Sequence, residues 1–202
     1  MKLYYAPGAC SLAPHIVACE AGLALDLVKV DLANKKTETG DDYWKVNPKG
    51  YVPTLVLDSG EVITEAAVIC QYLADQRPDS GLLAPCGSIE RYNQMSVLNF
   101  IATEVHKNIG ALFNPALTPE MRSVQMAGIA RRLNTLNQML AGRDYIMGDR
   151  FTAPDAYLFT VLNWTRLHKI DTSGWPHIEA FKARVGAREK VRAAMQEEGL
   201  LS

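Results

Sequence analysis

The sequence predicts an α/β unit over residues 1–80 followed by an all-helical unit over residues 88–202. Up to residue 76, segments with strand and helix periodicity alternate in the order strand, helix, strand, irregular segment, hairpin and helix. Residues 78–87 are rich in proline and glycine, which is typical of a linker, and no convincing strand pattern follows them. With a short helix in the irregular segment, the order βαβαββα is the layout of a thioredoxin-like domain.

Each element of the first unit has its own local signal. A proline-glycine pair ends the first strand, and Ser11 is placed to cap the helix that follows. A tight turn containing Gly60 joins two short strands into an antiparallel hairpin. The expected strands cover residues 2–6, 25–32, 52–57 and 61–64, and the expected helices cover residues 11–21, 42–46 and 65–76.

The second unit is predicted from apolar residues that recur every three or four positions. A long amphipathic helix is expected to carry Met95, Leu98 and Ala102 on its apolar face. Thr152 caps a later helix, and Asp155 can return a hydrogen bond to the N–H of the cap, as in a capping box. The expected helices cover residues 88–114, 119–140, 155–168, 175–183 and 188–197.

The composition predicts a protein with a sizeable core, since 48% of the 202 residues are hydrophobic and 21% are charged. The net charge of −1 favours neither nucleic acid nor an anionic membrane. No apolar run reaches the roughly 18 residues of a membrane span, and the first residues do not resemble a signal peptide. We therefore expect a cytoplasmic protein with no nucleic-acid or membrane partner.

The four cysteines, Cys10, Cys19, Cys70 and Cys86, are expected to be free thiols in a reducing compartment. Their spacing matches no zinc pattern, so no metal site is expected. Cys19 and Cys70 lie on apolar helix faces, which predicts core packing, and Cys86 has no assigned role. Cys10 stands where the first helix begins, and the unpaired N–H groups there would stabilise a thiolate and lower its pKa. The alternative for Cys10 is an ordinary small residue in a turn.

Three further patterns each allow a functional and a structural interpretation. A cis peptide between Val52 and Pro53 would leave the backbone groups of Val52 free to pair with an extended peptide, whereas a trans proline would only start a strand. Glu65 opens a helix, where it can complement the helix dipole or accept the ammonium group of a ligand. On the long helix over residues 88–114, a polar stripe runs beside the apolar face and could either line a cleft or face solvent. It consists of Asn99, Thr103, His106 and Gly110.

Five segments together resemble the glutathione S-transferase family, most closely its bacterial beta class. They are residues 5–11 (Tyr-Ala-Pro-Gly-Ala-Cys-Ser), 47–53 (Asn-Pro-Lys-Gly-Tyr-Val-Pro), 57–60, 63–66 (Ile-Thr-Glu-Ala) and 148–155 (Gly-Asp-Arg-Phe-Thr-Ala-Pro-Asp). The segments occur in both units in the expected order, so the resemblance covers essentially the whole chain. It implies a homodimer that uses glutathione as a co-substrate and needs no other cofactor.

The resemblance also implies which residues would hold glutathione. Val52, before a cis Pro53, would pair with the cysteinyl backbone, and Cys10 would lie beside the sulfur. Glu65 and Ala66 would hold the γ-glutamyl end, although the family often has serine where this chain has Ala66. The remaining residues implied for this site are Lys35 and Tyr51 near the glycine carboxylate, and Asn99 of a second copy with Thr103 and Glu104 nearby.

The implied reaction is attack of the glutathione thiolate on a small hydrophobic electrophile, with thiol–disulfide, peroxide or dehalogenation chemistry as a side activity. His106 would act beside Cys10 in proton transfer or water ordering. The residues implied for the electrophile site are Tyr5, His106, Lys107, Phe113 and Trp164. Two alternatives remain open: a monothiol reductase similar to glutaredoxin, and a catalytically silent module that only binds glutathione.

Overall fold

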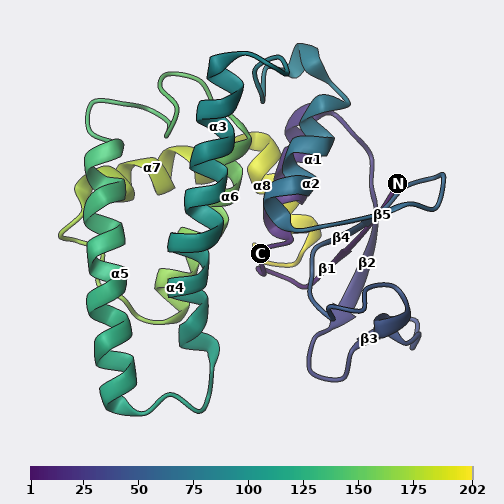
Figure 1. Cartoon of the computed structure of the whole chain (residues 1–202), viewed down its shortest axis with the longest axis horizontal. Helices are drawn as coiled ribbons and strands as arrows, with labels where there is room; N and C mark the ends of the chain where they lie inside the picture. The colour runs from purple at the N-terminus through teal and green to yellow at the C-terminus, as the bar shows by residue number, and fades with distance from the viewer. Residues whose placement is uncertain (202) are drawn as a thin grey trace.

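The computed structural model describes residues 1–201 and contains a sheet flanked by helices together with a larger group of helices (Figure 1). The predicted fold class, a thioredoxin-like unit followed by a helical unit, is confirmed. The strands are β1 (Lys2–Tyr5), β2 (Asp26–Asp31), β3 (Lys36–Thr37), β4 (Thr54–Val56) and β5 (Val62–Thr64). The first two α-helices are α1 (Leu12–Ala21) and α2 (Ala66–Asp75).

The five strands form one sheet in the order β3-β2-β1-β4-β5. β1 lies at its centre, parallel to β2 and antiparallel to β4, so that Leu3 is opposite Leu27 on one side and Leu55 on the other. The predicted hairpin is confirmed, because β4 and β5 pair antiparallel. α1 and α2 pack against each other, and their Ile16 and Ile69 are fully buried in the core (Figure 1).

The irregular segment contains more structure than the sequence predicts. The expected short helix is a 3₁₀ turn, η1 (Tyr43–Lys45), which Asp42 caps by accepting from the N–H of Trp44. The two-residue strand β3 is not predicted, because two residues are too few to show alternation. Its Thr37 pairs with Val30 of β2.

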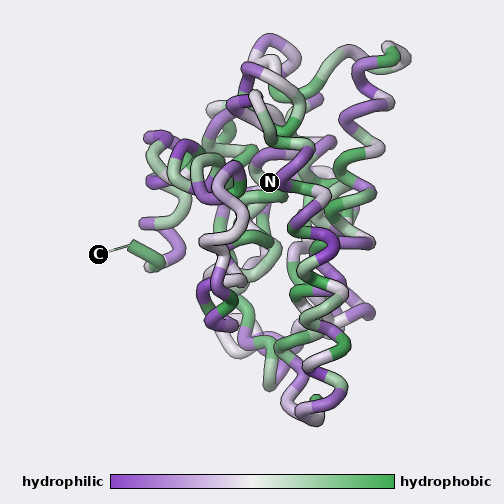
Figure 2. The backbone as a smooth tube through the Cα atoms, turned by 90° about the vertical axis from the view of Figure 1, so that its left-hand side faces the viewer, coloured by the Kyte–Doolittle hydropathy of each residue, from purple (hydrophilic) through white to green (hydrophobic). Residues whose placement is uncertain are grey.

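The helices of the second unit alternate hydrophilic and hydrophobic stretches along their length (Figure 2). None of the helices within residues 1–201 is both long and apolar enough to cross a membrane. They are α3 (Ile89–Phe100), α4 (Lys107–Gly110), α5 (Pro119–Met139), α6 (Ala153–Leu167), α7 (Pro176–Gly186) and α8 (Glu189–Glu197), with the shorter turns η2 (Pro78–Ser80), η3 (Ile101–His106) and η4 (Ala111–Phe113).

The expected uniform helix over residues 88–114 is corrected by the structure. A π-helical turn, η3, separates α3 from α4, and η4 then tightens the end into a 3₁₀ turn. Ile101 is fully buried, whereas Met95, which was expected on the apolar face, is exposed.

The expected linker is packed rather than loose. Leu82 and Leu83 are buried, and the N–H of Ala153 at the start of α6 donates to the carbonyl of Leu82 at 2.9 Å. Arg91 of α3 reaches back to Asp75 of α2 with two hydrogen bonds of 2.7 Å. These contacts fasten the beginning of the helical unit to the thioredoxin-like unit.

The capping box that opens α6 is confirmed. Asp155 is fully buried and accepts from the N–H of Thr152 at 2.8 Å, from the hydroxyl of Thr152 at 2.7 Å and from the N–H of Ile146 at 2.7 Å. Burial nevertheless raises the pKa of Asp155 to about 6, against the lowering effect of these donors. The carboxylate holds the turn before α6 in place.

The end of the chain returns to the first unit, where α8 packs against α1 (Figure 1). The buried imidazole of His15 lies between two carboxylates, with Nδ1 3.1 Å from Glu198 and Nε2 2.8 Å from Glu197. Burial alone would lower the pKa of His15, but hydrogen bonds with Cys19 and the two glutamates raise it to about 10. His15 is therefore a buried imidazolium at neutral pH.

This ion group predicts a loss of stability at alkaline pH. The folded pKa of about 10 lies above the ordinary value of 6.5, so the contribution of His15 is complete below pH 6.5 and disappears as pH rises towards 10. We expect the free energy of unfolding from urea denaturation to fall between pH 7 and pH 10. In His15→Gln, which has no charge to lose, the fall should be clearly smaller. Parallel pH profiles for the two proteins would contradict this.

Candidate active site

The loop between β1 and α1 presents Cys10 and is held at several points. The hydroxyl of Ser11 accepts from the N–H of Ala6 at 3.1 Å and donates to its carbonyl at 3.2 Å. The expectation that Ser11 caps α1 with its side chain is therefore wrong, although Ser11 does occupy the cap position. Gly8 donates its N–H to Glu198 at 2.9 Å and accepts from the indole of Trp164 at 2.9 Å.

Cys10 faces the backbone of the loop before β4. Its Sγ donates to the carbonyl of Val52 at 3.2 Å. The expected lowering of its pKa is wrong for the protein alone, because burial raises the pKa of Cys10 to about 12. The N–H groups of Cys10 and Ser11 do lower it, as expected at a helix start, but they do not offset the burial. Cys10 is therefore a neutral thiol that acts as a hydrogen-bond donor.

The peptide bond between Val52 and Pro53 is cis. The N–H of Val52 has no hydrogen-bond acceptor among the described residues, and its carbonyl receives the thiol of Cys10. Val52 itself is buried, so an extended ligand would reach its backbone rather than its side chain. A free donor and a nearby thiol on one edge suit a short peptide that contains sulfur.

Glu65 stands at the start of α2 with a backbone φ of 72°. A residue other than glycine in this left-handed region costs roughly 1 kcal/mol, so the structure around it must hold it there. Its carboxylate is exposed and forms an ion pair with Lys49 at 2.8 Å. Ala66 follows as the first residue of α2 and is buried. The arrangement presents a carboxylate and the helix N-terminus side by side.

Lys35 extends across the loop that contains Tyr51. Its Nζ donates to the carbonyl of Gly50 at 2.8 Å and lies 5.6 Å from the ring centre of Tyr51 and 5.8 Å from that of Trp44. The Tyr51 ring is 70% exposed. Lys35 and Tyr51 are thus brought close to each other.

The residues expected to act from a second copy lie on α3 and η3. Asn99 and Thr103 are exposed, and the hydroxyl of Thr103 donates to the carbonyl of Asn99 at 3.0 Å. Glu104 instead forms an ion pair with Arg132 of α5 at 2.7 Å, within the same chain. This pair is not expected from the sequence, because the two residues lie on different helices.

Three of the five residues expected around the electrophile, His106, Phe113 and Trp164, gather into an aromatic cluster. The ring of Trp164 lies 4.9 Å from His106 and 5.5 Å from Phe113, both edge to face. His106 shares a hydrogen bond of 2.6 Å between Nδ1 and the hydroxyl of Tyr157, and burial lowers the pKa of His106 to about 4. Phe113 is 52% exposed. Lys107 is exposed beside this group, whereas Tyr5 is almost fully buried and offers little surface.

Sequence reasoning missed several residues of the site. Tyr157 orients His106, and His168 packs on Phe113 at 4.3 Å between ring centres. Trp44 lies against Lys35, and Lys49 pairs with Glu65. Trp44 and Lys49 belong to the polar segment before the hairpin, where no periodicity marks them. Tyr157 lies in a strongly apolar helix, which resembles ordinary core.

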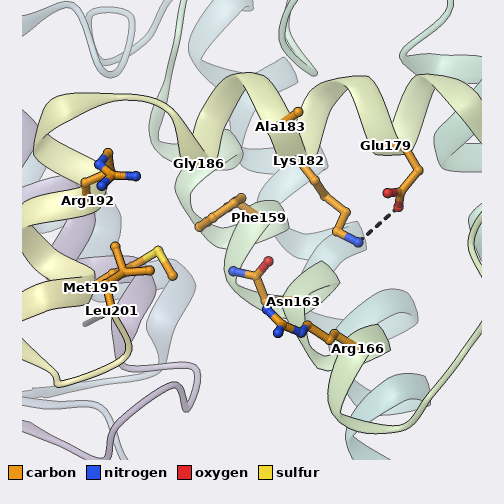
Figure 3. A pocket seen from close by; sticks show the side chains of 10 residues that line it. All are labelled: Phe159, Asn163, Arg166, Glu179, Lys182, Ala183, Gly186, Arg192, Met195 and Leu201. Carbon is orange, nitrogen blue, oxygen red and sulfur yellow. Dashed lines mark hydrogen bonds and ion pairs between the residues drawn. The ribbon is translucent and has the colours of Figure 1, made fainter.

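A separate groove of about 350 Å³ lies between α6, α7 and α8 (Figure 3). None of the residues expected in the site lines it. Three cations, Arg166, Lys182 and Arg192, project into it, and Lys182 is paired with Glu179 at 3.0 Å. We assign the groove no part in the site around Cys10.

The thioredoxin-like unit, the helical unit and a thiol at the start of the first helix define a class of thiol-dependent transferases, and the chain belongs to the glutathione S-transferase family. Residues 8–76 match the glutathione S-transferase N-terminal domain, and residues 100–189 match its C-terminal domain. The chain is similar to glutathione S-transferase GstA of Escherichia coli O157:H7, with 49% identity over 200 residues that cover 99% of this chain and 100% of the relative.

Two solved structures place the resemblance within one class. A bacterial beta class glutathione S-transferase from Sphingomonas chungbukensis is 44% identical, with a TM-score of 0.96 and full coverage of both chains. A sphingomonad glutathione S-transferase complexed with glutathione has the same identity, TM-score and coverage. The resemblance to the beta class is therefore confirmed.

The state of Cys10 can be tested by alkylation without glutathione. Because burial raises the pKa of Cys10 to about 12, its reaction with iodoacetamide should keep accelerating up to pH 10 without a plateau. The modified peptides are measured by mass spectrometry, and the exposed Cys86 serves as an internal control for the reagent. A plateau in the rate at Cys10 below pH 8 would refute the assignment.

The protonation of His106 gives a second test. With a pKa of about 4, the ring should stay neutral from about pH 5.5 to pH 8. Its imidazole signal in NMR, assigned by its loss in His106→Gln, should then keep a constant chemical shift over this range. Histidines of the urea-unfolded chain titrate near 6.5 and provide the reference. A midpoint near neutrality for the assigned signal would show that burial does not control this ring.

Proposed function

We propose that the chain transfers the glutathione thiolate to small hydrophobic electrophiles. The observation that carries this proposal is the backbone of Val52, whose N–H has no acceptor among residues 1–201 and whose carbonyl lies 3.2 Å from the Cys10 thiol. A cysteinyl residue that pairs with this backbone would bring its own sulfur next to Cys10. Membership of the glutathione S-transferase family supports glutathione as the molecule that provides it.

The rest of glutathione fits the charges on either side of Val52. The γ-glutamyl end carries an ammonium and a carboxylate, which match the carboxylate of Glu65 and the helix N-terminus at Ala66. The glycine carboxylate would lie near Lys35 and Tyr51 on the opposite side. In the free protein Lys49 forms an exposed ion pair with Glu65. The ligand ammonium would have to displace Lys49, which costs little because exposed ion pairs contribute little energy.

A neutral Cys10 suits activation of the glutathione sulfur. A free thiol near pKa 8.5 is mostly protonated at pH 7, and lowering its pKa by two units needs about 2.7 kcal/mol of preferential stabilisation of the thiolate. A hydrogen bond to a charged group contributes about 1.5–3 kcal/mol. The Cys10 thiol can turn from the Val52 carbonyl to the incoming sulfur and donate to it, and the N–H groups at the start of α1 add to the effect.

The aromatic cluster forms the proposed electrophile site. The half-exposed ring of Phe113 and the edge of Trp164 offer an apolar surface for a small hydrophobic molecule, with Lys107 at its margin. His106 is neutral and leaves Nε2 without a protein partner among the described residues, so it can order a water or exchange a proton with the leaving group. Tyr5 is buried and is assigned no contact with the electrophile.

We also propose that the active form is a cytoplasmic homodimer in which Asn99 and Thr103 of a second copy reach the γ-glutamyl group. Residues 1–80 would form the glutathione-binding domain, and residues 88–202 the electrophile site and the dimer interface. An exposed apolar set on α2 and α3 supports an interface there: Val68, Ile89, Tyr92 and Met95. Glu104 would contribute only by buttressing this region through Arg132.

A reductase activity through a mixed disulfide between Cys10 and glutathione is the second candidate. The position of the thiol beside the proposed sulfur site favours it, but the high pKa of Cys10 makes the thiol a slow nucleophile before glutathione binds. We therefore rank this reaction below conjugation. Peroxide reduction and dehalogenation would use the same glutathione thiolate, and both stand as further candidate side reactions.

Exchanging Cys10 separates the two activities. In Cys10→Ala the donor is lost, and kcat/KM for conjugation to a halonitroarene should fall about 10- to 100-fold, equivalent to 1.5–3 kcal/mol. In Cys10→Ser the donor is kept, so most of the conjugation should return while reduction of a mixed disulfide stays abolished. Cys86→Ala is the control and should change neither rate. Equal conjugation by all variants, or no binding of glutathione by calorimetry, would reject the proposal.

A further inference from the structure

A second cluster of reactive side chains lies apart from Cys10, where α1 meets the end of the chain. A ring nitrogen of His15, Cys19 Sγ and a carboxylate oxygen of Glu197 all lie within 4.8 Å of one another. His15 and Cys19 are four residues apart on α1 and therefore share one face of the helix. Glu197 is the last residue of α8, which packs against α1 (Figure 1).

We propose that His15, Cys19 and Glu197 bind a borderline-soft divalent cation such as Zn²⁺. An imidazole nitrogen, a thiolate and a carboxylate are the ligand types that zinc uses, whereas Mg²⁺ and Ca²⁺ prefer oxygen alone. Zinc bonds of about 2.0–2.3 Å hold tetrahedral ligands roughly 3.3–3.7 Å apart. The His15–Glu197 pair at 2.8 Å would have to open and the widest pair, within 4.8 Å, would have to close, and the Glu197 side chain, 55% exposed, can make this adjustment. Water would complete the fourth position.

The hydrogen bonding of His15 is typical of a histidine that binds a metal. A histidine that binds a metal usually donates its other ring N–H to a carboxylate, which fixes the orientation of the ring. Nδ1 of His15 lies 3.1 Å from Glu198, whose side chain is completely buried and also accepts from the N–H of Gly8. Glu198 thereby holds Nε2 towards Glu197, which it meets at 2.8 Å.

Metal binding would leave the charge of the cluster unchanged. Starting from the imidazolium form of His15, whose Nε2 lies 2.8 Å from Glu197, and from the thiol form of Cys19, binding releases two protons. On binding, His15 loses the Nε2 proton, Cys19 loses the thiol proton, and bonds form from the metal to nitrogen, sulfur and oxygen. Two protons leave and one dication enters, so no uncompensated charge is added to this partly buried place.

The sequence alone could not predict this site, and the expectation of no metal site followed from cysteine and histidine spacing. His15 and Cys19 supply only two ligands, and Glu197 comes 182 residues after His15. The proposal does not depend on the chemistry at Cys10 or on the proposed transferase function.

The site can be tested with Co²⁺ on the chelator-treated full chain in the absence of glutathione. We expect thiolate-to-cobalt absorption in the near ultraviolet that saturates at one ion per chain and disappears when Zn²⁺ is added. Cys19→Ser should abolish the absorption, and Glu197→Gln should weaken Co²⁺ binding at least tenfold. The matched controls are Cys10→Ser, Cys86→Ser and Glu189→Gln, which should bind as the unchanged protein does.

A measurement on the unchanged chain guards against variants that fold poorly. Zn²⁺ should slow the alkylation of Cys19 by iodoacetamide at least tenfold and leave Cys86 unaffected, as measured by peptide mass spectrometry. The proposal is overturned if no absorption appears, if it persists in Cys19→Ser, if it is lost in Cys10→Ser or Cys86→Ser, or if Zn²⁺ fails to protect Cys19.

Discussion

The structure of the site depends on how the loop before α1 is held. Its Gly8 is fixed from both sides, by the Glu198 carboxylate on the N–H and by the Trp164 indole on the carbonyl. The φ of Gly8 is +70°, and a side chain there would meet Leu200 at 3.3 Å, so only glycine suits this position. The hydroxyl of Ser11 closes the loop from within. The position of Cys10 is thus set by groups from its own loop, from α6 and from the segment after α8.

Burial and the helix N-terminus act on Cys10 in opposite directions, and their magnitudes decide the outcome. The partial charge at a helix start stabilises a nearby anion by about 0.3–1 kcal/mol, and up to about 2 kcal/mol in partly buried positions. Taking an anion out of water costs several kcal/mol. The thiol therefore stays protonated, as its donation to Val52 requires. A second anion beside the glutathione thiolate would oppose catalysis, so a neutral donor is the better neighbour.

Features specified by adjacent residues could be predicted from the sequence. The hairpin follows from its glycine turn, and the capping box from Thr152 and Asp155. The π turn at η3 could not be predicted, because the apolar pattern fits an α-helix almost equally well. The pKa of Cys10 could not be predicted either, since distant segments of the chain bury it. The resemblance indicated Phe113 and Trp164, but only packing brings in Tyr157.

The final residues of the chain belong physically to the first unit. Glu198 satisfies both the N–H of Gly8 and the imidazolium of His15, and Leu200 covers the glycine. Without them a backbone donor and a buried cation would lose their partners, and each such loss costs about 1–3 kcal/mol or more. Because the free energy of unfolding of a domain is only about 5–15 kcal/mol, several such losses would remove a large part of it. The thioredoxin-like unit therefore requires the end of the helical unit to keep Cys10 in position, which couples the two units energetically.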